Sequence, residues 1–188
     1  MLVDSHSHLF LEEFFGDLPQ VMQRAHDAGV THIFMPNIDS TTIGPLLSVC
    51  NTYKGFCFPM IGLHPTSVNE SYEKELDIVA HQLAPFNEYV AIGEIGLDLY
   101  WDKTFLKEQL IVFEKQIEWA LEYHLPIVVH CREAFEYIYK VLEPYKKSGL
   151  KGIFHSFTGT SEEAEKLLEF PDFMLGINGV VTFKKSQL

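Results

Sequence analysis

Residues 89–96 read YVAIGEIG, an apolar run that is interrupted near its end by a single carboxylate, Glu94. Runs that are apolar without regular alternation are typical of strands buried on both faces of a parallel sheet. Comparable runs recur along the chain at residues 1–6, 30–37, 55–62, 125–131, 150–157 and 172–179. The chain is therefore predicted to contain seven such strands.

Helical patterns separate these runs. Residues 17–29 open with Asp17, a residue type favoured at helix N-caps, and end at Gly29, which favours a helix stop. Residues 103–124 carry apolar side chains with the 3.6-residue period of a helix. Residues 160–168 open with the spacing of a capping box, which also predicts a helix start.

Strands that alternate with helices predict an α/β fold with a parallel sheet. Seven βα-type units without an obvious reversal of strand order favour a (β/α)₈ barrel of the TIM type, and an open sheet stays the alternative. Since a complete barrel of this type has eight βα units, about seven of the eight are expected in this chain. We expect residues 1–188 to form this single domain.

The composition is that of an ordinary globular protein, with 47% hydrophobic and 21% charged residues. The three cysteines form no CxxC pair, which favours free thiols in a reducing compartment. No signal-peptide pattern is visible, and the longest apolar run falls below the ~18 residues that a membrane span needs. These features predict a soluble cytoplasmic protein without a membrane or an obligate protein partner.

The net charge of −12 argues against a broad basic face that would bind nucleic acid without regard to sequence. It does not exclude an enzyme that processes nucleic acid, because bound divalent metal ions would add local positive charge.

In barrels of this type the catalytic groups lie at the C-terminal ends of the strands. The polar residues at or just beyond the expected strand ends are His6, His8, Asn37, Asp39, His64, Glu94, His130, His155 and Asn178. Imidazole and carboxylate groups suit Zn²⁺ and Mn²⁺, whereas Mg²⁺ prefers more oxygen ligands. The strand ends therefore predict a metal site.

Two metal ions that act together, about 3.5–4 Å apart, need a carboxylate between them. Glu94 is the natural bridge and thus a catalytic as well as a metal-binding residue. One ion would bind His6, His8 and Glu94, and the other would bind Glu94, His130 and His155. This arrangement predicts two divalent ions (Zn, Mg or Mn) that activate a water molecule for attack on phosphorus or an acyl carbon.

Four further side chains have roles that the sequence leaves open. His64 could contact a phosphate or form a structural hydrogen bond, and Arg132 could pair with a phosphate or with a carboxylate such as Glu133. Both are candidate catalytic residues. Asp4 and Asp98 are expected to orient the ligands or shape the loops rather than to bind metal.

Six segments together carry a resemblance to a known family: DSHSH (4–8), GLHP (62–65), AIGEIGLDLYW (91–101), PIVVHCREA (126–134), FHSFTG (154–159) and GINGVVTFK (176–184). The sequence resembles the TatD family of metal-dependent deoxyribonucleases, within the amidohydrolase-like superfamily. The resemblance implies a (β/α)₈ barrel and a divalent-metal hydrolase with DNA phosphodiesters as substrate, acting on single strands or ends. It also implies the metal ligands His6, His8, Glu94, His130 and His155.

The resemblance has one departure. The family pattern carries a strand-eight segment with an aspartate ligand, whereas the last aspartate here, Asp172, precedes the seventh run. We expect a C-terminally truncated domain; a disrupted reading frame or completion by a second chain is the alternative. Weaker metal binding and exposed strand edges would follow.

Three functions follow from these observations. The leading one is a two-metal phosphodiesterase that cleaves DNA. The second is an amide, ester or lactone hydrolase on the same barrel, although such relatives often bridge their metals with a carboxylated lysine where this chain has Glu94. The third is an inactive truncated remnant.

Overall fold

The computed structural model describes residues 1–83 and 88–186. Its strands are β1 (Leu2–Asp4), β2 (Val30–Met35), β3 (Cys57–Pro59), β4 (Ile92–Asp98), β5 (Ile127–Arg132), β6 (Gly152–Phe154) and β7 (Phe173–Leu175). Its α-helices are α1 (Leu18–Asp27), α2 (Ile43–Thr52), α3 (Tyr72–Gln82), α4 (Leu106–Glu122), α5 (Phe135–Leu142) and α6 (Ser161–Leu167). Short 3₁₀ turns lie at Glu12–Phe14, Pro65–Ser67, Glu143–Tyr145 and Gly179–Thr182. Among these described helices, none has both the length and the apolar character of a membrane span.

The strands are parallel and follow the order of the chain. One ladder contains β1, β2 and β3, and a second contains β4, β5, β6 and β7. A parallel bridge between Ile61, just after β3, and Ile92 joins the two ladders. The strand order never reverses, which is the order of a (β/α)₈ barrel and not of an open doubly wound sheet. The predicted fold class is thus confirmed, with seven strands within the described residues.

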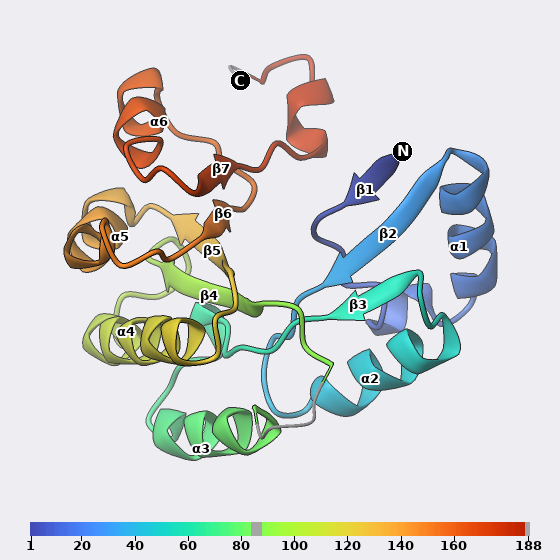
Figure 1. Cartoon of the computed structure of the whole chain (residues 1–188), viewed down its shortest axis with the longest axis horizontal. Helices are drawn as coiled ribbons and strands as arrows, with labels where there is room; N and C mark the ends of the chain where they lie inside the picture. The colour runs from blue at the N-terminus through green and yellow to red at the C-terminus, as the bar shows by residue number, and fades with distance from the viewer. Residues whose placement is uncertain (84–87, 187–188) are drawn as a thin grey trace.

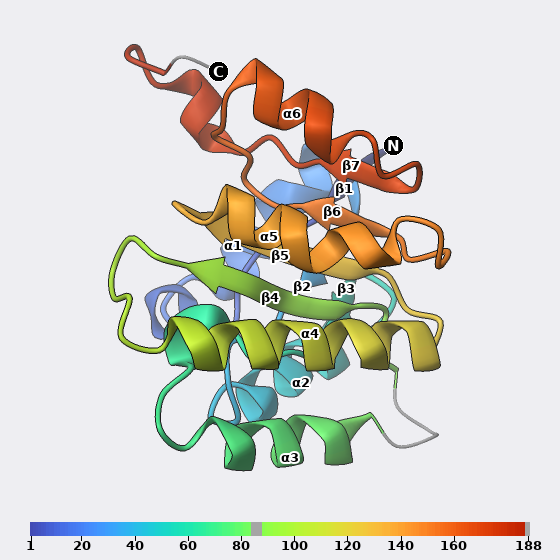
Figure 2. The ribbon, with the colours of Figure 1, turned by 90° about the vertical axis from the view of Figure 1, so that its left-hand side faces the viewer.

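The helices lie on the outer side of the strands (Figure 1). Figure 2 shows α3, α4, α5 and α6 one above the other in chain order, along one side of the molecule. The helix starts follow local rules: α6 begins after Thr160, whose side chain accepts a hydrogen bond from the Glu163 amide while the Glu163 side chain accepts from the Thr160 amide. The predicted capping box is confirmed.

Burial is strongest in the middle of the strand order. All seven residues of β4 are buried, and Phe113 and Ile117 of α4 belong to the same core. By contrast, Leu2 and Val3 of β1 are 57% and 46% exposed, and Met174 of β7 is 69% exposed. Burial on both faces, predicted for every apolar run, is therefore wrong for β1 and β7. Within the described residues no ladder joins these two strands, so each has a neighbour on one side only. The expected truncation stays a prediction.

The ladders are shorter than the apolar runs that predicted them. The run at residues 1–6 gives a ladder of three residues, and so does the run at residues 55–62. The chain leaves the ladder early at these ends, after Asp4 and after Pro59. An apolar pattern does not show how far backbone pairing extends.

Gly96 of β4 lies where the backbone of the next strand comes closest. It pairs with His130 of β5, and its φ of +136° is one that other residues rarely adopt. A Cβ atom at this position would lie 2.1 Å from the carbonyl oxygen of His130. The glycine is therefore required for β4 and β5 to pair at this point.

We predict that Gly96→Ala lowers the free energy of unfolding by about 3 kcal/mol or more, from a strained backbone and an overpacked contact. Gly44→Ala is the matched control, because Gly44 lies in α2 with nothing within 4 Å of its added methyl group. The control should leave the free energy of unfolding unchanged or raise it by up to about 1 kcal/mol, because Gly44 lies in the first turn of the helix. Urea unfolding checks both values; equal effects would show that β4 and β5 can shift apart at no cost.

Candidate metal centre

Glu94 is the centre of the site and is only 3% exposed. Its Oε2 atom lies 3.0 Å from Nε2 of His6, 3.4 Å from Nε2 of His8 and 3.7 Å from Nε2 of His64. Its Oε1 atom lies 3.0 Å from Nδ1 of His130. His6 and His8 follow β1, His64 follows β3, and His130 lies in β5. The buried carboxylate of Glu94 thus contacts imidazoles that come from three other strands or the segments just after them.

His155, which follows β6, stacks on His6 with ring centroids 3.3 Å apart. Donor atoms within 4.8 Å of one another form two groups: His6, Glu94 and His155, and His64, Glu94 and His130. The grouping differs from the expected one, which put His155 beside His130. The reason is the sheet order: β3 and β5 flank β4, so His64 and His130 meet on its carboxylate.

His64 differs from the other imidazoles in its hydrogen bonds. Its Nδ1 atom accepts a hydrogen bond from the backbone amide of Thr66 at 3.2 Å. Burial lowers the pKa of His64 to about 4, so one proton remains on the ring at neutral pH. That proton must lie on Nε2, which is 3.3 Å from Nδ1 of His130. His64 therefore presents an N–H donor to the site, which suits a hydrogen bond to an anion better than a bond to a metal ion.

The remaining donor set fits a divalent cation. The Nε2 atoms of His6 and His8 lie 3.2 Å apart and point at the same oxygen of Glu94. Burial lowers the pKa of His155 to about 3, so this imidazole is neutral with a free lone pair. Lone pairs and a carboxylate repel one another at these distances unless a proton or a cation lies between them. In the part of the chain that the structure describes, Nδ1 of His6 and of His8 have no hydrogen-bond partner.

Glu94 is held as an anion in spite of its burial. Burial would raise its pKa, and hydrogen bonds with His130, His6 and His8 outweigh burial and keep the pKa well below its usual value. Burial likewise would lower the pKa of His130, but its contacts with Glu94 and Asp98 raise that pKa overall. The charge at the centre of the site is thus fixed by its neighbours.

Asp98 supports the site from the end of β4. Its Oδ2 atom lies 2.8 Å from Nε2 of His130, and its Oδ1 atom accepts hydrogen bonds from the amides of Tyr100 and Trp101. A proton on Nε2 of His130 leaves Nδ1 free to face Glu94, which is how carboxylates commonly orient metal-binding imidazoles.

Asp4 shapes the first loop by accepting a hydrogen bond from the His6 amide. Neither Asp4 nor Asp98 belongs to the two donor groups, and their expected orienting role stays a prediction.

Three buried amide side chains hold the strand ends in place: Asn37, which sequence reasoning placed at a strand end, and Gln109 and Gln116, which it missed. Asn37 donates to the carbonyl of Gly62, and its own backbone exchanges hydrogen bonds with Gly93 and Glu94. From α4, Gln116 bonds the amide and carbonyl of Leu63.

Gln109, also in α4, does the same for Asp98. Gln109 and Gln116 lie on one helix face, and both are buried. The sequence did carry a signal for these two residues, because both glutamines lie on the apolar face of the predicted helix.

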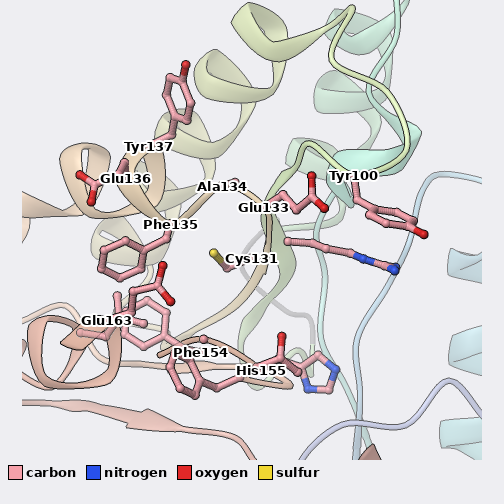
Figure 3. A pocket seen from close by; sticks show the side chains of 15 residues that line it. Tyr100, Cys131, Glu133, Ala134, Phe135, Glu136, Tyr137, Phe154, His155 and Glu163 are labelled. Carbon is pink, nitrogen blue, oxygen red and sulfur yellow. The ribbon is translucent and has the colours of Figure 1, made fainter. Parts of the chain in front are cut away.

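Arg132, at the end of β5, forms no ion pair with Glu133 or with any other carboxylate that the structure describes. Its guanidinium carbon lies 3.8 Å from the centroid of the Tyr100 ring. Together with His155, these side chains border a cavity of 680 Å³ between β5, α5 and α6. Figure 3 shows Tyr100 and His155 at one side of this cavity and Phe135 at the other. The cavity opens directly beside the metal-binding groups.

The comparisons with known proteins show the family to which this chain is similar. The family model described as TatD related DNase matches residues 3–188. The metal-dependent hydrolase YabD of Bacillus subtilis is 36% identical over 100% of this chain and 72% of its own length. The 3'-5' ssDNA/RNA exonuclease TatD of Pantoea vagans is 32% identical over 96% of this chain and 68% of its own length. The crystal structure of YjjV, a TatD homologue from Escherichia coli K12, matches 98% of this chain and 71% of its own with a TM-score of 0.89 and 27% identity.

We predict that Asp98→Asn weakens metal binding by about 10- to 100-fold, because the substitution keeps the oxygen that shapes the loop but removes the charge beside His130. Competition with a chelator for Zn²⁺ or Mn²⁺ measures this change. Asp77→Asn, an exposed position on α3, is the control and should bind like the parent. Unchanged affinity in Asp98→Asn would mean that His130 needs no anionic partner to bind metal.

Proposed function

The chain belongs to the TatD-related DNase family of metal-dependent hydrolases, and from this premise we propose that it cleaves phosphodiester bonds of DNA with two divalent metal ions. The single observation that carries the proposal is Glu94, whose two carboxylate oxygens face imidazoles on opposite sides. A buried bridge of this kind is what a pair of ions needs. The relatives named as single-strand exonucleases support single-stranded DNA, attacked from an end, as the substrate.

The proposed ligands are His6, His8, Glu94, His130 and His155. Bound ions would supply Lewis-acid polarisation of a phosphoryl oxygen and a water molecule whose pKa is lowered toward neutrality. Zn²⁺ and Mn²⁺ suit the imidazole-rich set better than Mg²⁺ does. The contribution of the chain itself is to hold these groups rigidly, through the buried hydrogen bonds of the strand ends.

Two further residues would act on the substrate. His64 directs its Nε2 proton toward Glu94 and His130, where it can donate a hydrogen bond to a phosphoryl oxygen. Arg132, free of carboxylate partners among the described residues, can pair with a non-bridging oxygen of the phosphate. These geometries favour the phosphate-binding alternatives for both residues.

We also propose that the protein acts in the cytoplasm. Cys50, Cys57 and Cys131 are free thiols. Burial raises the pKa of Cys50 and of Cys57 to about 12, so these thiols stay protonated and unreactive. Free, protonated thiols are ordinary in a reducing compartment.

The test is elemental analysis of the purified chain together with cleavage of a single-stranded oligonucleotide in the presence of Mn²⁺ or Mg²⁺. About two ions per chain with cleavage would support the proposal. Activity on a panel of lactones and amides with none on DNA would favour the second hydrolase class. A folded chain with metal content near zero and no cleavage would favour the inactive remnant.

We predict that Glu94→Gln loses both ions and at least about a hundredfold in cleavage rate, because the neutral amide no longer bridges two cations. Glu143→Gln, an exposed position after α5, is the control and should keep metal content and rate. Retention of two ions by Glu94→Gln would contradict the bridging role.

A further inference from the structure

Two large aromatic side chains lie exposed beside the metal-binding groups. Tyr100 is 49% exposed and Trp101 is 70% exposed, on the loop that directly follows β4. Both of their backbone amides donate to Oδ1 of Asp98, at 3.0 and 3.3 Å. The other oxygen of Asp98 binds His130. One buried carboxylate therefore fixes the aromatic loop relative to the metal centre.

Arg132 completes this cluster from the neighbouring strand. The backbone amide of Leu99 donates to the carbonyl of Arg132 at 2.9 Å, which ties the loop to the end of β5. The Arg132 guanidinium lies 3.8 Å from the Tyr100 ring centroid and 5.3 Å from that of Trp101. The two rings stand at 86° to each other, with centroids 4.8 Å apart. A flat cation and two rings in different orientations thus form one rim of the site.

A purely structural role accounts for only part of this cluster. The contact between Arg132 and Tyr100 stabilises the loop to some extent, as cation–π pairs do. Trp101, however, leaves most of its surface in water, where a large apolar ring gains little from packing. Its exposed face is available to another flat group.

We propose that Tyr100 and Trp101, with Arg132 packed against them, form a stacking platform for an unpaired nucleobase of a single-stranded substrate. This inference rests on the proposed nuclease function and names how that site selects its substrate. Aromatic rings and arginine planes stack on any base without regard to sequence. Bases within a duplex hide their faces, so the platform selects single strands or frayed ends.

The net charge of the chain favours a contact with the bases over many contacts with phosphates. Proteins that bind nucleic acid usually gain most of their affinity from many contacts between basic residues and phosphates. This chain has a net charge of −12, and its acidic residues outnumber its basic ones by 26 to 14. Stacking next to the scissile phosphate is independent of that charge and supplies the affinity that a basic face would otherwise provide.

The chain offers a direct probe, because it contains two tryptophans and the other, Trp119, is buried in α4. In the Trp119→Phe variant, the fluorescence of Trp101 is observed alone. This variant is titrated in EDTA, where no metal-dependent cleavage takes place, with a ten-nucleotide oligothymidylate or with an abasic strand of equal length. We expect the oligothymidylate to quench the fluorescence and the abasic strand to leave it unchanged.

Substitutions on the parent chain then test the energetic role. Trp101→Ala should weaken binding of the labelled oligothymidylate roughly tenfold in fluorescence anisotropy, within the range of base stacking, whereas Trp101→Phe should bind nearly as well as the parent. Tyr123→Ala removes an exposed aromatic residue just after α4, at the opposite end of the strands, and should bind like the parent. Thermal unfolding of each variant shows that the fold is intact.

The outcomes separate this proposal from the nuclease proposal. Equal quenching by the abasic strand, or unchanged binding by Trp101→Ala, would overturn the platform. Quenching by oligothymidylate that is followed by no cleavage once Mn²⁺ is added would support the platform and overturn the nuclease function. Cleavage with no difference between Trp101→Ala and the parent, on strands with and without bases, would leave the nuclease function standing and overturn the platform.

Discussion

The buried negative charge of Glu94 is the constraint on which the rest of the structure depends. A carboxylate that is 3% exposed is strongly destabilising unless partners compensate its lost hydration. The imidazoles that compensate this charge come from several different strands, and the backbone that carries each imidazole must be held in place. Asn37 and Gln116 serve this purpose by satisfying backbone groups that leave the ladders. The buried polar network is thus a consequence of burying the Glu94 carboxylate within a largely apolar core.

Much of this could be read from the sequence because it is local. Period, caps and apolar runs depend on neighbouring residues, so the fold class and the strands that carry Glu94 and His130 followed from them. The predicted strand ends at these two residues were wrong, because β4 continues to Asp98 and β5 to Arg132. The grouping of the imidazoles did not, because it depends on which strands flank β4. The proton position on His64 was also hidden, since it is set by the Thr66 amide in a turn that no pattern marks. Exposure of β1 and β7 depends on neighbours that an apolar run does not reveal.

Asp98 connects two parts of the site, His130 and the loop that carries Trp101, which lie in separate segments of the sequence. Through one oxygen it orients His130 in the metal centre, and through the other it shapes the loop that carries Trp101. A rigid link of this kind would keep the proposed metal centre and the proposed stacking platform in a constant relation, which is the geometric condition for efficient positioning. It also explains why a buried aspartate that belongs to neither donor group lies so close to the centre.

The order of the ligands along the chain has a consequence for how the protein acquires its native state. His6 and His155 stack on each other although nearly the whole described chain lies between them. The site therefore cannot form on the ribosome until β6 has emerged, and closing so long a loop is entropically slow. Metal uptake is then a late event, and ions that bind only the finished site stabilise it by mass action, by about 2.7 kcal/mol at a hundred times the dissociation constant. Metal availability in the cell would thus govern how long this chain survives as well as what it does.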